Sequence, residues 1–253
     1  MLTGAPVTPA IRAVLFDKDG TLIDFRATWL PAYEAIVRRL VDSDERAVDR
    51  LLTAGGYDRA SGRIDPSSVL AAGTNVEIAA LWAGLIGHDD VAGLATRVNR
   101  DFMQHAETSL VPVTDLPILF RGLRQRGLRL GVATNDSELA LRAQIERLQI
   151  GELIDFFCGY DSGHGAKPGP GMVEAFARTL GLPAAAIAVV GDSLHDLDMA
   201  RAAGAGLTIG VLTGASPRET LAPHADHVIA SIAEIETILA PRLQREIRHD
   251  GTG

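Results

Sequence analysis

Cysteine is almost absent from this 253-residue chain, in which Cys158 is the only one. A lone cysteine cannot form an intrachain disulfide, and such a composition is typical of proteins from reducing compartments. We therefore expect a cytoplasmic protein. Since Cys158 follows Phe156 and Phe157 in an apolar run, we interpret it as a core residue and not as a nucleophile.

Long apolar runs are also missing, because no stretch reaches the length needed to span a bilayer. Residues 1–6 lack the basic start and the apolar core of a secretory signal. Positive charge is in deficit: the formal net charge is −8, which argues against a general affinity for nucleic acid. We therefore expect no membrane or nucleic-acid partner, and an anionic ligand would need local positive charge or a metal ion. The sequence does not specify an oligomeric state.

Lysine is scarce as well, since Lys18 and Lys167 are the only lysines among 24 basic residues. The compact ammonium group suits a tight polar site in which the broad guanidinium of arginine does not fit. Lys167 gains support from the motifs described below, whereas nothing else in the sequence gives Lys18 a role.

Apolar runs and amphipathic helices alternate after residue 110. Near-continuous apolar strands between helices indicate an α/β fold with a parallel, Rossmann-like sheet that is covered on both faces. We expect strands over residues 13–16, 128–133, 156–159, 187–190, 207–211 and 227–229, and helices over 115–126, 137–148, 172–180, 195–203 and 233–239.

The segment between the first strand and residue 110 has a different pattern, with helices and no strand. The helices are expected over residues 28–41, 45–52, 75–86 and 91–105. A helical block inserted at this point suggests a smaller domain over the carboxyl ends of the strands, where open α/β sheets bind ligands. We therefore predict a core domain of residues 1–24 and 110–253 and a helical cap domain of residues 25–109.

A pair of carboxylates, Asp17 and Asp19, follows the first predicted strand directly. Residues i and i+2 of an extended chain point the same way, so the two share one site while Lys18 points elsewhere. Close carboxylates repel each other unless a cation or a shared proton intervenes. The pair therefore indicates a metal site, an acid/base pair or both, although Asp and Gly are also ordinary turn residues.

Polar residues recur after three further elements of the predicted core. In a parallel sheet the carboxyl ends of the strands lie on one edge, so these groups can share one cleft with the first pair. Each has a plainer interpretation: a helix cap or first-turn acid for the residues that begin helices, and a loop charge for the lysine. The groups are Thr134 with Asn135, then Lys167, then Asp192 with Asp196.

This ordered set resembles the haloacid dehalogenase-like hydrolase superfamily, and within it the phosphatases of the phosphoglycolate phosphatase type, which carry a helical cap. The resemblance implies that Asp17 is the nucleophile that forms an aspartyl-phosphate, and that Asp19 is the acid/base. It assigns phosphate binding to Thr134, to Asn135 with the nearby backbone N–H groups, and to Lys167, which also bridges nucleophile and phosphoryl group.

The resemblance further implies a Mg²⁺ cofactor. Its ligands would be Asp17, Asp192 and the backbone carbonyl of Asp19, with Asp196 in support. The implied reaction is Mg²⁺-dependent hydrolysis of a small phosphomonoester, either phosphoglycolate-like or a sugar phosphate, so the expected partner is a small phosphorylated metabolite.

Two departures from the phosphoglycolate phosphatase pattern follow the first motif: Lys18 replaces a leucine, and the serine expected after Asp24 is missing. Arg26 could bind a substrate carboxylate through its planar fork or, equally, form a structural ion pair. Trp29 could form a wall of the pocket or be a core residue. Two alternatives to the phosphatase stay open: a phosphomutase or phosphotransferase of the same superfamily, and a non-catalytic binding module on this fold.

Overall fold

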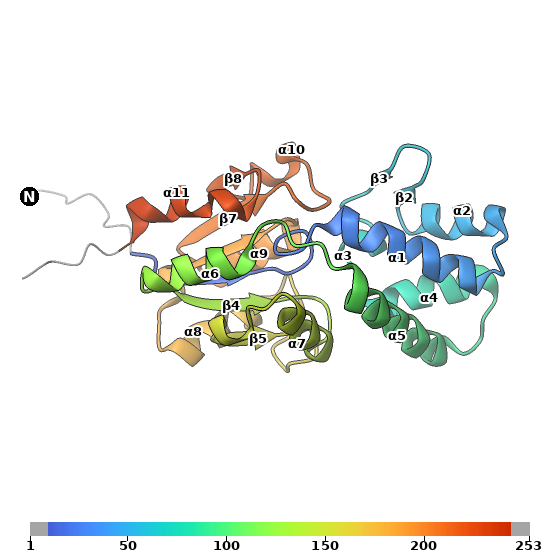
Figure 1. Ribbon diagram of the computed structural model, residues 1–253, viewed down its shortest axis with the longest axis horizontal. Coiled ribbons are helices and arrows are strands. Elements are labelled where there is room, and N and C mark those ends of the chain that lie inside the picture. Colours follow the sequence, from blue (N-terminus) through green and yellow to red (C-terminus); the bar gives the residue numbers. More distant parts are fainter. Residues whose placement is uncertain (1–9, 244–253) are drawn as a thin grey trace, which may run out of the picture.

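The computed structural model describes residues 10–243 and has two parts (Figure 1). One part is a sheet with helices on both faces. The other consists mainly of helices and is formed by residues 25–109, which we call the cap segment; the rest is called the core. The prediction for residues 1–6 lies outside the described residues.

All six strands of the core sheet are parallel, in the order β5-β4-β1-β6-β7-β8. Numbered along the chain within this sheet alone, that order is 3-2-1-4-5-6, the arrangement of doubly wound Rossmann folds. The predicted α/β fold is therefore confirmed. The strands are β1 (Ala13–Phe16), β4 (Arg129–Ala133), β5 (Phe156–Cys158), β6 (Ile187–Gly191), β7 (Leu207–Val211) and β8 (His227–Ile229).

Both faces of the sheet are covered by helices, which explains why its strands are mainly apolar. Within β1, Val14 and Phe16 belong to one hydrophobic cluster, whereas Ala13 and Leu15 belong to another on the opposite face, as alternation along a strand requires. Helices α6 (Leu116–Gln125), α7 (Glu138–Arg147) and α11 (Ile235–Leu239) cover the first face, and α8 (Gly171–Leu180) and α9 (Leu194–Ala202) cover the second.

Capping residues determine where several helices begin and end. The Asp24 side chain accepts a hydrogen bond from the backbone N–H of Ala27, so α1 (Phe25–Leu40) begins at Phe25. Gly87 follows α4 (Asn75–Ile86) and Gly181 follows α8, both in the left-handed conformation, with φ of 68° and 63°, which glycine adopts without a steric penalty. The element boundaries therefore follow local chemistry that the sequence displays.

The cap segment contains five helices and a short hairpin. The hairpin contradicts the prediction of no strand in this region, because Tyr57–Asp58 and Arg63–Ile64 pair antiparallel. Two residues per strand are too few to produce a recognisable alternation of apolar and polar residues. The elements are α1 (Phe25–Leu40), α2 (Glu45–Ala54), β2 (Tyr57–Asp58), β3 (Arg63–Ile64), α3 (Val69–Ala72), α4 (Asn75–Ile86) and α5 (Val91–Ser109).

A separate hydrophobic cluster holds the cap segment together. Its buried members, which include Trp82 and Phe102, all lie between residues 25 and 106 except Ala215, which belongs to the core. The two chain segments that join the parts lie side by side, since the Asp24 N–H donates to the Val111 carbonyl at 2.8 Å. These features support the prediction that the domains meet at residues 24/25 and 109/110. Among residues 10–243, no helix is long and apolar enough to cross a membrane.

Candidate active site

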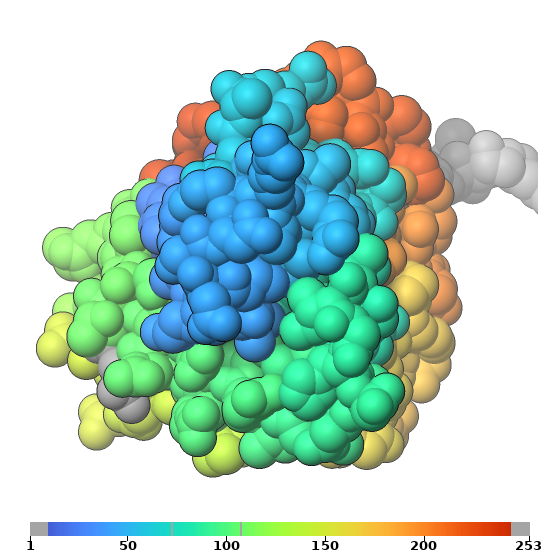
Figure 2. Space-filling model, turned by 90° about the vertical axis from the view of Figure 1, so that its right-hand side faces the viewer, coloured from blue at the N-terminus to red at the C-terminus, as the bar shows by residue number. Residues whose placement is uncertain are grey.

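Three neighbouring strands of the sheet end in predicted site residues. Asp17 follows β1, Thr134 follows β4, and Asp192 follows β6. Because β1 lies between β4 and β6, this is the point at which the chain switches from one side of the sheet to the other, the usual ligand-binding position of such folds. A cavity lies here between core and cap segment. In Figure 2 the cap segment lies in front of the core.

Three buried carboxylates surround one buried ammonium group at the base of the cavity. Asp17, Asp192 and Asp196 each offer an oxygen within 4.8 Å of the others. Lys167 Nζ donates to Asp17 Oδ1 and to Asp196 Oδ1, both at 2.6 Å. Burial raises the pKa of Asp17 to about 7, although Lys167 opposes the rise, and burial likewise raises the pKa of Asp192. The cluster thus carries more negative charge than Lys167 alone neutralises.

Two glycines leave the space that the Asp192 carboxylate occupies. A Cβ on Gly214 would lie 1.7 Å from Asp192 Oδ2, and a Cβ on Gly20 would lie 2.6 Å from it. The same oxygen accepts a hydrogen bond from the backbone N–H of Ala215 at 3.1 Å. A carboxylate held in this way, beside Asp17, offers the hard oxygen ligands that Mg²⁺ prefers, so the residues fit the implied ion.

Asp196 combines two roles that the sequence left as alternatives. Its Oδ1 accepts from Lys167, and its Oδ2 accepts from Ser193 Oγ at 2.6 Å and from the Ser193 N–H at 3.1 Å. Ser193, and not Asp192, is the N-cap of α9. Asp196 is therefore both a first-turn acid and the residue that holds Lys167 in place.

The side chains of Thr134 and Asn135 make different contacts in the site. Asn135 Oδ1 accepts from the backbone N–H of Lys167 at 2.9 Å, and Asn135 Nδ2 donates to the Lys167 carbonyl at 3.3 Å. The Asn135 side chain thus positions Lys167. Thr134 is buried, and its Oγ1 accepts from the backbone N–H of Asp136 at 3.1 Å, so its O–H can still donate to a ligand in the cavity.

Lys18 is a site residue that the sequence argument missed. It is fully buried, with Nζ 2.7 Å from Asp19 Oδ2 and 3.2 Å from Asp136 Oδ2. Burial alone would lower the pKa of Lys18, but the two carboxylates outweigh it and the pKa is raised. The expectation that Lys18 points away from its neighbours is wrong because β1 ends at Phe16. The chain then turns, and the Leu22 N–H donates to the Lys18 carbonyl at 2.8 Å.

Asp19 has a second partner, which comes from the cap segment. Trp29 Nε1, on α1, donates to Asp19 Oδ1 at 2.7 Å, and Lys18 Nζ lies 5.4 Å from the centroid of the Trp29 ring. Trp29 also lines the cavity and is buried, so both interpretations of this residue are confirmed. Lys18 and Trp29 together fix both oxygens of the predicted acid/base.

Arg26 lies away from these residues. It is exposed, and its Nη1 donates to the Gly62 carbonyl at 3.4 Å. It is not among the residues that line the cavity. The structure therefore brings together every predicted site residue except Arg26.

A family model described as haloacid dehalogenase-like hydrolase matches residues 11–204. A phosphoglycolate phosphatase of Rhodospirillum rubrum is 32% identical over 200 residues, which cover 76% of each chain. Another, of Pseudomonas putida, is 31% identical over 206 residues, 79% of this chain and 70% of its own. The crystal structure of a predicted phosphoglycolate phosphatase from Haemophilus somnus shares the fold, with a TM-score of 0.70 at 18% identity over 90% of this chain and 97% of its own. The chain therefore belongs to the haloacid dehalogenase-like hydrolases, as a phosphatase of the phosphoglycolate phosphatase type.

Proposed function

We propose that the protein is a Mg²⁺-dependent phosphatase that hydrolyses a small phosphomonoester, phosphoglycolate-like or a sugar phosphate, through an aspartyl-phosphate on Asp17. The observation that carries the proposal is the placement of Asp17 at the end of β1, hydrogen-bonded to Lys167 inside a cluster of buried carboxylates. A carboxylate so placed is held for attack, and its negative charge is partly balanced.

The same cluster supports the choice of cofactor. Asp17, Asp192 and the backbone carbonyl of Asp19 would hold Mg²⁺, with Asp196 in support through Lys167. When bound, the ion would neutralise charge on the carboxylates and on the phosphate, which otherwise repel each other.

In the first half-reaction a carboxylate oxygen of Asp17 attacks phosphorus, and the bond between phosphorus and the alcohol oxygen breaks. The departing alkoxide takes a proton from Asp19, which must therefore enter this step protonated. Thr134 Oγ1 and the neighbouring backbone N–H groups would donate to the oxygens of the phosphoryl group, and the Lys167 ammonium would balance the charge that builds up there.

In the second half-reaction Asp19, now a carboxylate, takes a proton from water. The resulting hydroxide attacks phosphorus, the bond between phosphorus and Asp17 breaks, and inorganic phosphate leaves. Lys18 Nζ and Trp29 Nε1 both hydrogen-bond best to a carboxylate, so their contacts support Asp19 in this second step.

The partner and the compartment belong to the same proposal. A small phosphorylated metabolite agrees with the names of the relatives, which are phosphatases. The buried, single cysteine agrees with a cytoplasmic location, since the chain needs no disulfide.

The test is phosphate release from phosphoglycolate, sugar phosphates and nucleotides, with and without Mg²⁺, with Asp17→Asn as control. Release that requires Mg²⁺ and is abolished in Asp17→Asn would support the proposal. Transfer of the phosphoryl group to a sugar hydroxyl in preference to water would favour the phosphomutase alternative. A folded protein that neither binds Mg²⁺ nor releases phosphate would be the binding module.

A further inference from the structure

The cap segment contributes a predominantly apolar wall to the cavity. Six large side chains of this wall are buried, with exposed fractions of 2–6%, and they come from four helices. They are Phe25, Trp29, Tyr33, Leu70, Ile78 and Phe102. Opposite them lies the charged cluster of the core, so the phosphate and the alcohol part of a substrate meet different surroundings.

The polar atoms of the aromatic side chains in this wall are already hydrogen-bonded within the protein. Trp29 Nε1 donates to Asp19, and the Tyr33 hydroxyl donates to the Leu70 carbonyl at 2.6 Å. Asn75, the one amide that the cap segment adds to the lining, donates through Nδ2 to Asn99 Oδ1 at 3.0 Å. The aromatic residues therefore offer ring surface to a ligand and not hydrogen-bond donors.

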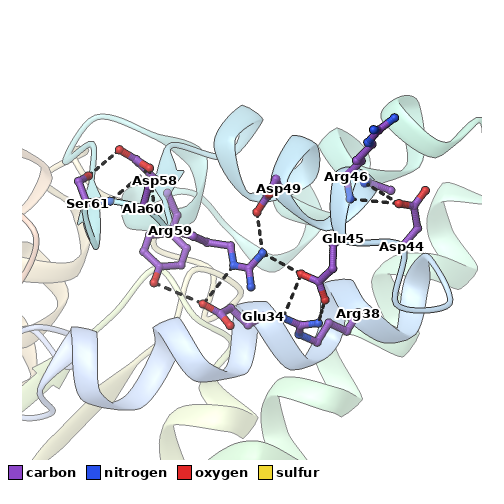
Figure 3. Close-up of polar contacts among 12 residues, drawn as sticks. Glu34, Arg38, Asp44, Glu45, Arg46, Asp49, Asp58, Arg59, Ala60 and Ser61 are labelled. Atoms are coloured by element: carbon purple, nitrogen blue, oxygen red, sulfur yellow. Dashed lines mark hydrogen bonds and ion pairs between the residues drawn. The ribbon is translucent and has the colours of Figure 1, made fainter.

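Cations of the cap segment lie elsewhere. Within residues 10–243, no arginine of this segment lines the cavity. On its outer face Arg59 pairs with Glu34, Glu45 and Asp49, and Arg38 pairs with Glu45 (Figure 3). These arginines are bound to carboxylates away from the site.

The lysines of the site are occupied as well. Lys18 pairs with Asp19 and Asp136, and Lys167 pairs with Asp17 and Asp196. On the core side, His195 is the remaining lining residue that can carry a positive charge. The lysines at the cavity are thus bound to its own carboxylates, and only a histidine remains to pair with a second anion.

A substrate carboxylate would be poorly accommodated in these surroundings. On the far side of the substrate from the phosphate, the carboxylate would be desolvated by aromatic and aliphatic side chains and would find no free arginine or lysine to pair with. The nearby carboxylates of Asp19 and Asp136 would also repel it. An uncharged group with an apolar face would instead bury its surface against the rings. Both effects favour a substrate with an uncharged alcohol part over one with a carboxylate.

We infer that the site takes phosphomonoesters whose alcohol part is uncharged and has an apolar face, and that it disfavours a carboxylate in that position. The inference rests on the proposed phosphatase function and narrows it. The inferred substrate class thus differs from phosphoglycolate, the compound after which the relatives are named.

Three alkyl phosphates test the inference, each with Mg²⁺ and the wild-type chain. Phosphoglycolate and 2-hydroxyethyl phosphate differ in the carboxylate, and benzyl phosphate adds an apolar ring while it keeps an alcohol as leaving group. We expect kcat/KM to rise from phosphoglycolate to 2-hydroxyethyl phosphate to benzyl phosphate, with at least about a tenfold difference between first and last. A preference for phosphoglycolate would overturn the inference and leave the proposed function standing. No metal-dependent release from any of the three would contradict both.

A variant that adds a cation to the wall sharpens the test. Asn75→Arg should raise the ratio of kcat/KM for phosphoglycolate to that for benzyl phosphate about tenfold, whereas the matched Asn75→Gln should leave this ratio near the wild-type value. A thermal melt of each variant checks that it is folded. If His195→Gln selectively removes activity on phosphoglycolate, the histidine supplies the missing cation and the inference is wrong.

Discussion

The core side of the cavity is lined mainly by charged and polar groups, whereas the cap side is lined mainly by apolar side chains. On the core side, charged groups bind one another in the interior, as Lys167 does with Asp17 and Asp196. On the cap side, rings and aliphatic chains such as Phe25 and Ile78 form the wall. Strand ends in a rigid sheet can position charge within a fraction of an ångström, whereas a wall of apolar side chains selects by shape and burial. In the proposed phosphatase, the core side would carry out the reaction and the cap side would select the substrate.

One hydrogen bond crosses from one side to the other. Trp29 belongs to the cap segment, yet its Nε1 holds the predicted acid/base Asp19. If the core side carries out the reaction and the cap side selects the substrate, substitutions on the core side should lower kcat for every substrate. Substitutions that remove the hydrogen bond between Trp29 and Asp19 should act most on substrates whose leaving group needs a proton from Asp19.

The largest effect is expected from Asp17→Asn. A carboxamide does not attack phosphorus, and loss of a covalent nucleophile lowers kcat by up to about a million-fold. Single-turnover and steady-state phosphate release would measure the loss. The variant should keep the wild-type melting profile, and substantial turnover in the folded variant would contradict the assignment of the nucleophile.

Asp19→Asn comes next, with a loss that depends on the leaving group. For benzyl phosphate we expect kcat/KM, which reports the steps up to departure of the alcohol, to fall about 100- to 10,000-fold, the usual contribution of a general acid or base. For p-nitrophenyl phosphate the fall should be smaller, because p-nitrophenolate departs without a proton. Equal losses on both substrates would argue against the acid role.

Lys18→Met tests the residue that the sequence did not reveal. Removing a partner that orients a catalytic side chain commonly costs about 10- to 100-fold in activity. Since Lys18 contacts Asp19 and no other predicted catalytic residue, the loss should follow the leaving-group pattern of Asp19→Asn in weaker form. A loss that is uniform across substrates would indicate a structural role only. Trp29→Phe, which removes the N–H donor and keeps an aromatic ring, is the matched test from the cap side.

Stability should respond to Mg²⁺ and pH together. Burial raises the pKa of Asp17 to about 7 in the metal-free protein, whereas in the unfolded chain its pKa is about 3.9. The unfolded state then binds fewer protons between these values, so the free energy of unfolding of the metal-free protein falls as pH rises from about 4 to about 7.

Mg²⁺ should oppose that loss, and at about 100 times its Kd it adds about 2.7 kcal/mol to the free energy of unfolding. Thermal melts at both ends of this pH range, with and without Mg²⁺, would measure the effect. Asp192→Asn should abolish most of the Mg²⁺-dependent rise in Tm. A rise that persists in this variant would place the ion elsewhere.

The smallest effect is expected from Arg26→Met, which removes an exposed guanidinium whose contact is the Gly62 carbonyl. Both kcat and KM should stay within about twofold of wild type, as for most surface substitutions. A loss on phosphoglycolate that 2-hydroxyethyl phosphate does not share would restore the role in carboxylate binding that the sequence suggested.

The sheet could be predicted closely because each of its strands is a short, mainly apolar run that can be recognised in the sequence. Leu207–Val211 is buried along its whole length and was expected with the same bounds, and so was Ala13–Phe16. The cluster of site residues followed from the sheet, since parallel strands bring their carboxyl ends to one edge. Neither step required knowledge of tertiary contacts beyond the sheet.

The parts that could not be predicted depend on where the backbone turns. Lys18 faces Asp19 and Asp136 because residues after Phe16 leave the strand, and the alternation rule no longer applies to them. Its one signal was the scarcity of lysine. Gly214 gave none, since its effect on Asp192 arises from a loop distant in sequence. The composition of the cap wall likewise depends on how four helices pack.

Ala215 links the cap segment to Asp192, a predicted ligand of Mg²⁺. Its side chain packs in the hydrophobic cluster of the cap segment, while its backbone N–H donates to Asp192 Oδ2. Coupling between two such sites is reciprocal, because the same free energy links them in both directions. A displacement of the cap segment that moves Ala215 would therefore also change the hydrogen bond to Asp192, and the proposed cation at Asp192 would in turn favour one position of the cap segment.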